Sequence, residues 1–249
     1  MLLTAFVAAA AAVPAADIPR SCSAVSPAHQ TALVELYTSQ GCSSCPPADR
    51  WLTWLDARYP RDRVVPIALH VNYWDHIGWK DPYARSEFTT RQRALAAANG
   101  SRTVYTPGVF VQGQEFPQWS GRASFDDAVR AVMASPASIR ITLKAQWTDI
   151  EVKVNASAVA LTSAREPRLY LALVENGLAT NVRAGENRGE TLQNDRVVRA
   201  WSGPLALEPA PVSWPLPAQA DRARYSIVGF AQGKDGRILQ AVDLPLRDC

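Results

Sequence analysis

The stretch that decides the fold is VELYTSQGCSSCPPADRWLTWL, residues 34–55, in which two cysteines separate an apolar run from an amphipathic one. The run that ends at Thr38 is short and almost wholly apolar, which is typical of a buried strand. After the cysteines, tryptophan and leucine recur at spacings of three and four, which predicts a helix over about residues 45–58. Two prolines directly after the second cysteine are tolerated only in a first helical turn, so the helix is expected to begin at Ser44 or Cys45.

The two cysteines, Cys42 and Cys45, therefore lie at the start of the predicted helix. A thiolate in that position is stabilised by unpaired backbone N–H groups and by the positive end of the helix dipole. We expect Cys42 to be exposed and to be the attacking thiol, with Cys45 as the resolving thiol and with Ser43 and Ser44 lining the site. The alternative is an inert bridge, but so small a loop removes little entropy from the unfolded chain.

The composition is that of a globular protein. The 249 residues are 47% hydrophobic and 20% charged, and the formal net charge is +3. A core of useful size can form from these residues. The charge is too small to indicate nucleic acid or an acidic surface as a partner, so no nucleic-acid binding is expected.

The first residues, MLLTAFVAAAAAVPAA (1–16), are apolar, rich in alanine and end in small side chains. This pattern predicts a secretory signal peptide, although no lysine or arginine precedes the apolar run. The run is shorter than the roughly 20 residues that span a bilayer, so no stable membrane anchor is expected after cleavage. The protein is therefore expected to be periplasmic or secreted.

Export changes how the four cysteines are interpreted, because an oxidising compartment favours disulfides. Cys22 follows the expected cleavage site and Cys249 is the last residue. We expect a structural Cys22–Cys249 bridge that ties the two ends together. That pairing leaves Cys42 and Cys45 to each other.

Two further segments of the first half carry candidate site residues. His70 ends a predicted strand over residues 64–71, and Trp74 follows in an aromatic, irregular segment. A structural role is the default for His70, and a place beside the cysteines is the alternative. Farther along, Thr106 and Pro107 lead into another short apolar strand, a position that suits a cis peptide bond.

After residue 136 the sequence changes character. Runs of alternating apolar and polar residues recur, and no strong helix pattern follows, which predicts antiparallel β structure. Between two of these strands, residues 176–196 are polar and contain glycine. They form either a plain surface loop or a flap over the cysteine site.

The order of parts over roughly residues 30–135 resembles the thioredoxin fold: strand, CxxC at a helix start, strand, helix, Thr-Pro, strand, glycine turn, strand and helix. In that fold the Thr-Pro segment faces the disulfide and holds an extended substrate, which implies substrate binding by Thr106 and Pro107. The strand before the cysteines carries a buried acid in that fold, and Glu35 occupies the corresponding strand here.

Four motifs also resemble a bacterial family of secreted thioredoxin-like proteins, the domain of unknown function 1223. They are VELYTSQGCSSCPPADRWL, HVNYWDHIGWKDPYARSEFTTRQRA, VYTPGVFVQG and GENRGETLQNDRVVR. The resemblance implies a fold and a compartment but no established substrate. We expect an α/β thioredoxin-like domain (26–136, with a helical insertion at 71–100), followed by an antiparallel all-β, sandwich-like domain (137–249).

The favoured function is an exported thiol–disulfide oxidoreductase acting on protein or small-molecule thiols and disulfides, with no cofactor and no resident metal. In this interpretation Glu35, if buried, takes the proton of Cys45; a strand residue facing solvent or an arginine is the alternative. One rival is a copper-binding, metallochaperone-like protein using Cys42, Cys45 and His70, because soft thiolates favour Cu(I). The other rival is a non-catalytic binding module with an inert disulfide.

Overall fold

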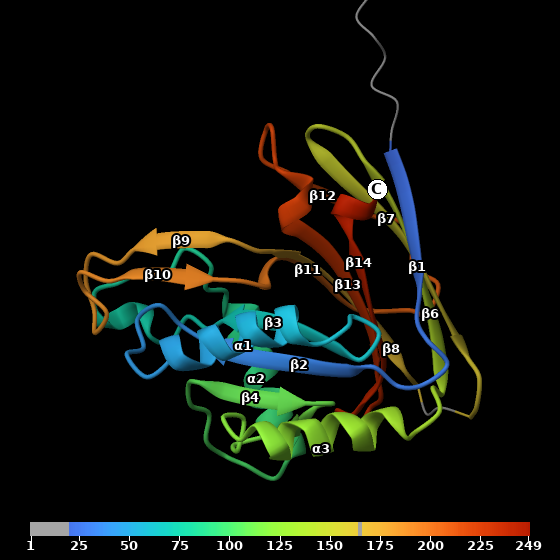
Figure 1. Cartoon of the computed structure of the whole chain (residues 1–249), viewed down its shortest axis with the longest axis horizontal. Coiled ribbons are helices and arrows are strands. Elements are labelled where there is room, and N and C mark those ends of the chain that lie inside the picture. Colours follow the sequence, from blue (N-terminus) through green and yellow to red (C-terminus); the bar gives the residue numbers. More distant parts are fainter. Residues whose placement is uncertain (1–19, 164–165) are drawn as a thin grey trace, which may run out of the picture.

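The computed structural model describes residues 20–163 and 166–249, so the expected signal peptide lies outside the described residues. Strands are the most abundant secondary structure in this part of the chain, and they form three sheets (Figure 1). The eight-stranded sheet runs in the order β14 (Ile238–Pro245), β13 (Tyr225–Gln232), β8 (Arg168–Glu175), β11 (Val197–Leu205), β3 (Val64–His70), β2 (Ala32–Thr38), β4 (Gly108–Val111) and β5 (Gln114–Glu115).

The two smaller sheets flank this large one. The four-stranded sheet has the order β1 (Arg20–Val25), β6 (Ile139–Trp147), β7 (Glu151–Ala160) and β12 (Val212–Pro215), and the two-stranded sheet pairs β9 (Leu178–Asn181) with β10 (Thr191–Asn194). The α-helices of the described ranges are α1 (Pro46–Arg58), α2 (Ser86–Ala98) and α3 (Arg122–Met133). Short 3₁₀ turns cover Asp75–Ile77, Arg222–Arg224 and Leu246–Asp248. No helix within the described ranges is long and apolar enough to cross a membrane.

The expected fold class, an α/β thioredoxin-like domain followed by an all-β domain, is wrong. Strand β3 pairs in parallel with β2 on one side and with β11 on the other, where Val197 lies opposite Ala68. Strand β11 then pairs antiparallel with β8, and the sheet continues through β13 to β14. Strands from both sides of residue 136 therefore form one mixed sheet. The reason is that periodicity reveals a strand but not the strand beside which it hydrogen-bonds.

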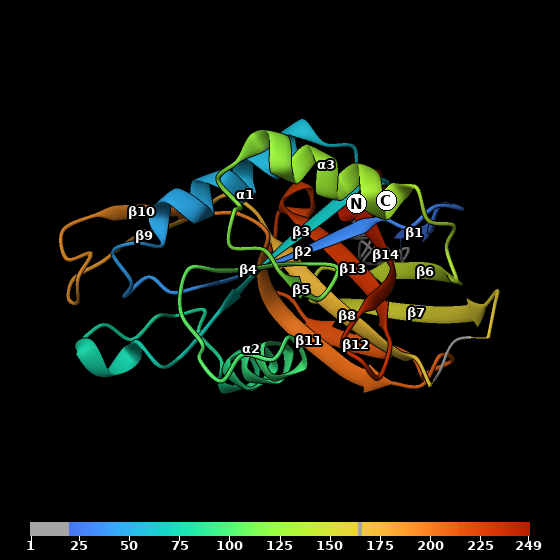
Figure 2. The same ribbon diagram turned by 90° about the horizontal axis from the view of Figure 1, so that it is seen from below.

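Helices cover both faces of the β2–β3 part of this sheet. In Figure 2, α1 and α3 lie on one side of the sheet and α2 on the other. Alternation along β2 explains the arrangement, because Val34 and Leu36 belong to the core shared with α1 and α3. Leu33 and Tyr37 belong instead to the core beneath α2, which includes Phe88. Glu35 lies between Leu33 and Tyr37 in this alternation, so its side chain is on the same face of the sheet as theirs.

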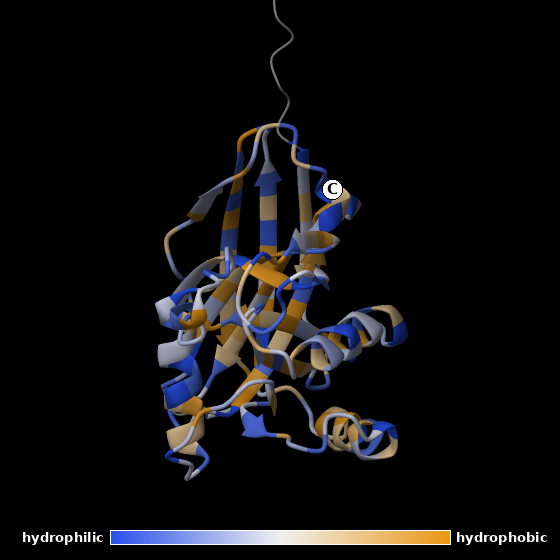
Figure 3. Cartoon of the chain, turned by 90° about the vertical axis from the view of Figure 1, so that its left-hand side faces the viewer, coloured by the Kyte–Doolittle hydropathy of each residue, from blue (hydrophilic) through white to orange (hydrophobic). Residues whose placement is uncertain are grey.

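The four-stranded sheet packs on the C-terminal part of the large sheet. Side chains alternate between buried and more exposed along β6, and hydrophilic and hydrophobic bands alternate along strands in Figure 3. Ile139, Ile141 and Leu143 share a core with Leu171 of β8. Cys22 on β1 is bonded to Cys249, as predicted, with their Cα atoms 4.8 Å apart.

Candidate functional site

The cysteine pair lies in a tight turn between β2 and α1. Cys42 and Cys45 form a disulfide, with their Cα atoms 5.4 Å apart. The amide of Cys42 donates to the carbonyl oxygen of Ser39 (3.1 Å), and the amide of Cys45 donates to that of Cys42 (3.2 Å). Helix α1 begins at Pro46, immediately after the second cysteine and one residue later than the latest predicted start, Cys45.

Both cysteines are fully buried, at 0% exposure, so the expectation that Cys42 lies exposed is wrong. Ser43 and Ser44 between them are exposed. The burial comes from segments distant in sequence that close over the turn. A helix start leaves backbone N–H groups facing outward, but nothing in that local rule says which other part of the chain covers them.

The first cover is the loop between β9 and β10, residues 182–190, here called the covering loop. Glu186 accepts hydrogen bonds from both the amide (2.9 Å) and the hydroxyl (2.7 Å) of Ser43. These bonds lower the pKa of the Glu186 carboxyl. Asn187 is buried, and its Nδ2 donates to the carbonyl oxygens of Gln40 and Cys42, both at 2.9 Å. Of the two interpretations of residues 176–196, the flap is the arrangement found.

The second cover comes from Thr106, whose peptide bond to Pro107 is cis. The carbonyl oxygen of Thr106 lies 3.8 Å from the Cys42 Sγ and accepts a 3.5 Å hydrogen bond from the Ser44 hydroxyl. The Trp74 indole donates to the Thr106 hydroxyl (2.7 Å). The structure thus brings the predicted residues Ser44, Trp74 and Thr106 together beside Cys42.

Glu35 is buried but makes its contacts elsewhere. The Arg91 guanidinium of α2 donates two hydrogen bonds to its carboxylate, from Nε (2.7 Å) and from one terminal nitrogen (2.9 Å). The Tyr37 hydroxyl donates a third hydrogen bond (2.9 Å). This is the alternative in which an arginine holds Glu35. The carboxylate faces α2, whereas α1, the helix that follows Cys45, packs on the opposite face of the sheet.

His70 is also buried and lies behind the cysteine turn. Its Nδ1 is 2.7 Å from the Asp81 carboxylate, which also accepts from the amide of Gln40 (2.8 Å). Burial opposes protonation of His70, but the neighbouring Asp81 outweighs it and raises the pKa of the imidazole. His70 therefore supports the turn through Asp81. Within the described residues, no group of three or more His, Cys, Asp or Glu is placed to hold a metal ion.

Asp49 is the residue that the sequence analysis missed. It lies one helical turn after Cys45, and its amide donates to the Cys45 carbonyl oxygen (3.1 Å). The residue is 7% exposed, and its Oδ1 has no hydrogen-bond partner among the described residues. Burial raises the pKa of Asp49 to about 6. The available signal was its spacing, because an acid four residues after a cysteine shares its helix face.

Asp49 also borders a surface hollow of about 440 Å³ between α1 and the covering loop. The hollow is lined by Pro46, Asp49, Arg50, Glu186, Asn187, Arg188, Glu190, Thr191, Leu192 and Gln193. The same loop thus covers the disulfide and forms a wall of the hollow that Asp49 borders. Movement of this loop would alter the surroundings of both groups.

Comparisons with known proteins add a family and a fold. No curated protein matches the chain. A structural-genomics crystal structure of an Agrobacterium tumefaciens protein is similar, with 24% identity, a TM-score of 0.61 and coverage of 87% of this chain and 94% of that one. HBP35 of Porphyromonas gingivalis is similar at 13% identity, with a TM-score of 0.62 and coverage of 90% and 77%. Because the model for the protein family of unknown function DUF1223 matches residues 33–232, the chain belongs to that family.

Proposed function

We propose that the protein is a thiol–disulfide oxidoreductase whose reacting groups are Cys42 and Cys45. The observation that carries the proposal is the disulfide at the start of α1, with Cys42 beside Thr106 and Ser44. The Ser44 hydroxyl lies 3.3 Å from the Cys42 Sγ and can donate to it as a thiolate. The two disulfides of the chain also fit an oxidising compartment, and we place the protein in the periplasm or outside the cell.

The exchange balances without a further oxidant or reductant. The Cys42 thiolate attacks one sulfur of a substrate disulfide, which forms a mixed disulfide and releases the other sulfur as a thiolate. Cys45 then loses its proton and attacks the Cys42 sulfur, which releases the second substrate thiolate and leaves the Cys42–Cys45 disulfide. Because both sulfurs are buried, the covering loop must withdraw before a substrate can reach Cys42.

Asp49 replaces Glu35 as the group proposed to take the Cys45 proton. It shares a helix face with Cys45, and its Oδ1 is left without a hydrogen bond among the described residues. A carboxyl with a pKa of about 6 is ionised at neutral pH and returns the proton readily. Glu35 forms an ion pair with Arg91 on the other face of the sheet.

The test is a trap with oxidised glutathione as the substrate disulfide. In Cys45→Ala, Cys42 is the single free thiol, and we expect one glutathione to be added to it, as read by intact mass. In the matched Cys42→Ala variant the free thiol is Cys45, packed beneath the start of α1, and we expect an adduct at least tenfold more slowly. Equal rates in the two variants would contradict the assignment of Cys42 as the attacking thiol.

Two measurements separate the proposal from its rivals. The reduction potential of the Cys42–Cys45 pair should lie within reach of glutathione; a value far below that range would mark the bridge as purely structural. Anaerobic titration of the reduced protein with Cu(I) addresses the metallochaperone-like alternative. Stoichiometric copper binding without any disulfide exchange would favour that alternative over the oxidoreductase.

Replacing Asp49 by asparagine is expected to stabilise the protein while slowing exchange. The pKa of Asp49 is about 6 in the folded protein, against an ordinary value of 3.8, so the folded state binds more protons between these values. Stability is therefore lost as the pH rises through that window. The asparagine variant avoids the loss, worth about 2–3 kcal/mol at pH 7 and nothing below about pH 3. Urea unfolding at both pH values measures the difference.

The exchange rate gives the second test of the same variant. The wild-type rate with oxidised glutathione should rise with a midpoint near pH 6, and Asp49→Asn should lack that rise. Asp127→Asn on the exposed side of α3 is the matched control and should change neither quantity. If Asp49→Asn gains stability but keeps the wild-type pH profile, Asp49 is a buried residue without a role in proton transfer.

A further inference from the structure

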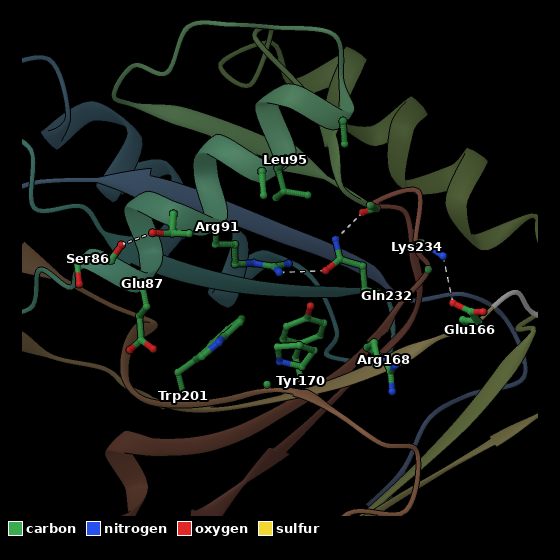
Figure 4. A pocket seen from close by; sticks show the side chains of 17 residues that line it. Ser86, Glu87, Arg91, Leu95, Glu166, Arg168, Tyr170, Trp201, Gln232 and Lys234 are labelled. Carbon is green, nitrogen blue, oxygen red and sulfur yellow. Dashed lines mark hydrogen bonds and ion pairs between the residues drawn. The ribbon is translucent and has the colours of Figure 1, made fainter.

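A second cavity lies on the α2 side of the large sheet. It has a volume of about 720 Å³ and lies between α2 on one side and β8 and β11 on the other, with the β13–β14 turn at its edge (Figure 4). A volume of this size suits a small molecule. Its lining residues include none from the cysteine turn, the covering loop or the Thr106–Pro107 segment. The cavity is therefore separate from the proposed redox site.

The floor of the cavity is aromatic. In Figure 4 the rings of Tyr170 and Trp201 lie side by side facing α2, and their centroids are 5.6 Å apart. Tyr170 is stacked on the buried Phe230, with centroids 5.0 Å apart and planes 8° apart, which holds its ring in place. Gly203 has φ 152°, and a Cβ there would collide with the Tyr170 ring, so glycine keeps the rim close to the floor.

The inner wall already contains a cation in contact with these rings. The Arg91 guanidinium carbon lies 5.0 Å from the Tyr170 centroid and 5.2 Å from that of Trp201. Its N–H groups are bound to Glu35 and to Gln232, the latter at 3.0 Å. A second cation over the same rings would meet repulsion from Arg91, so the aromatic floor is better suited to an uncharged ring.

The open end of the cavity carries the available charge. Lys234 is 3.3 Å from Glu166, so these two charges offset each other. Arg168 is exposed beside them and forms no ion pair within residues 20–163 and 166–249. At the other end Glu87 is paired with Arg85 (3.3 Å). The charge that lacks a partner at the rim is therefore positive and lies at one end of the floor.

We propose that this cavity binds a small, planar, largely apolar molecule that carries one anionic group. The planar body lies on Tyr170 and Trp201 beneath the apolar side chains of α2. The anionic group lies at the rim beside Arg168, whose planar guanidinium suits carboxylate, sulfonate or phosphate oxygens. The site is one of binding, and its operation does not depend on the chemistry of the cysteine pair.

The test uses 8-anilinonaphthalene-1-sulfonate and its uncharged parent, N-phenyl-1-naphthylamine, as a matched pair of probes. Titration followed by fluorescence should show one site that prefers the sulfonate. Trp201→Ala should lower the affinity for both probes about tenfold, because both rest on the aromatic floor. Arg168→Ala should lower the affinity for the sulfonate about threefold and leave the affinity for the uncharged parent unchanged. Arg140→Ala, an exposed arginine on β6, is the control and should alter neither.

A variant that fills the cavity distinguishes loss of the binding site from loss of folding. Ala94 is exposed on α2 and lines the cavity, so Ala94→Phe places a ring in the cavity without disturbing the core. We expect Ala94→Phe to abolish binding of both probes while its thermal unfolding stays near that of the wild type. If Ala94→Phe leaves binding intact, or if both probes bind equally and ignore Arg168→Ala, the proposal is overturned.

Discussion

Replacing Arg91 by methionine is expected to lower the free energy of unfolding by about 3–5 kcal/mol. The substitution keeps the length of the side chain but leaves the Glu35 carboxylate buried, at 1% side-chain exposure, without its cation. It also removes the hydrogen bond to Gln232 and the guanidinium from the aromatic rings beneath it. The Tyr37 hydroxyl alone cannot replace these contacts, because a lone donor does not neutralise a buried charge.

Urea unfolding at pH 7, followed by circular dichroism, measures this loss. Arg93→Met is the matched control: the residue lies two positions along α2, is exposed, and should change stability by less than about 0.5 kcal/mol. The double variant Glu35→Leu with Arg91→Met should recover much of the loss, because no buried charge then lacks a partner. A loss in Arg91→Met no larger than that in Arg93→Met would show that the pair is not structural.

Removing the terminal disulfide is the second large effect. Cys22 and Cys249 are 227 positions apart, so their bridge constrains nearly the whole unfolded chain. The chain-entropy relation gives about 5 kcal/mol for a loop of this size, and about 2 kcal/mol for the four-residue loop closed by Cys42 and Cys45. We expect Cys22→Ser with Cys249→Ser to destabilise the protein by roughly 3–5 kcal/mol.

Thermal and urea unfolding without reductant compare the two pairs directly. The Cys42→Ser and Cys45→Ser double variant serves as the matched control, because it also removes one disulfide and adds two hydroxyls. It should be clearly the more stable of the two double variants. The reverse order would assign the main structural role to the Cys42–Cys45 bridge, and would count against the redox proposal as well.

The sequence predicts local structure at the cysteine turn well. The apolar run predicts β2, the prolines set the start of α1 to within one residue, and both disulfide pairings are as expected. These features depend on neighbours in sequence or on counting four cysteines. The burial of Asp49 could have been inferred from its helix face, since Ala48, Leu52 and Leu55 are buried around it.

The architecture could not be predicted because it depends on which strands pair. Nothing in the periodicity of β11 says that it lies beside β3, although Arg196 helps fix that junction. The Arg196 side chain is fully buried, and it donates to the Pro66 carbonyl oxygen (2.9 Å) and contacts Asp243 (3.0 Å). A lone arginine after a polar loop normally indicates an exposed position. The orientation of Glu35 was uncertain for the same reason, since alternation does not say which helix covers which face.

Because of the covering loop, the reaction rate of the cysteine pair depends on two separate quantities, the intrinsic rate of the pair and the fraction of time the loop is open. Ser43 and Glu186, which hold the loop down, are 143 positions apart. If the loop closes faster than a disulfide reacts, the observed rate is the intrinsic rate multiplied by the fraction of time the loop is open. Intrinsic reactivity then belongs to α1 and Asp49, whereas the open fraction belongs to residues 182–190. Substitutions in this loop can therefore change how often the pair reacts.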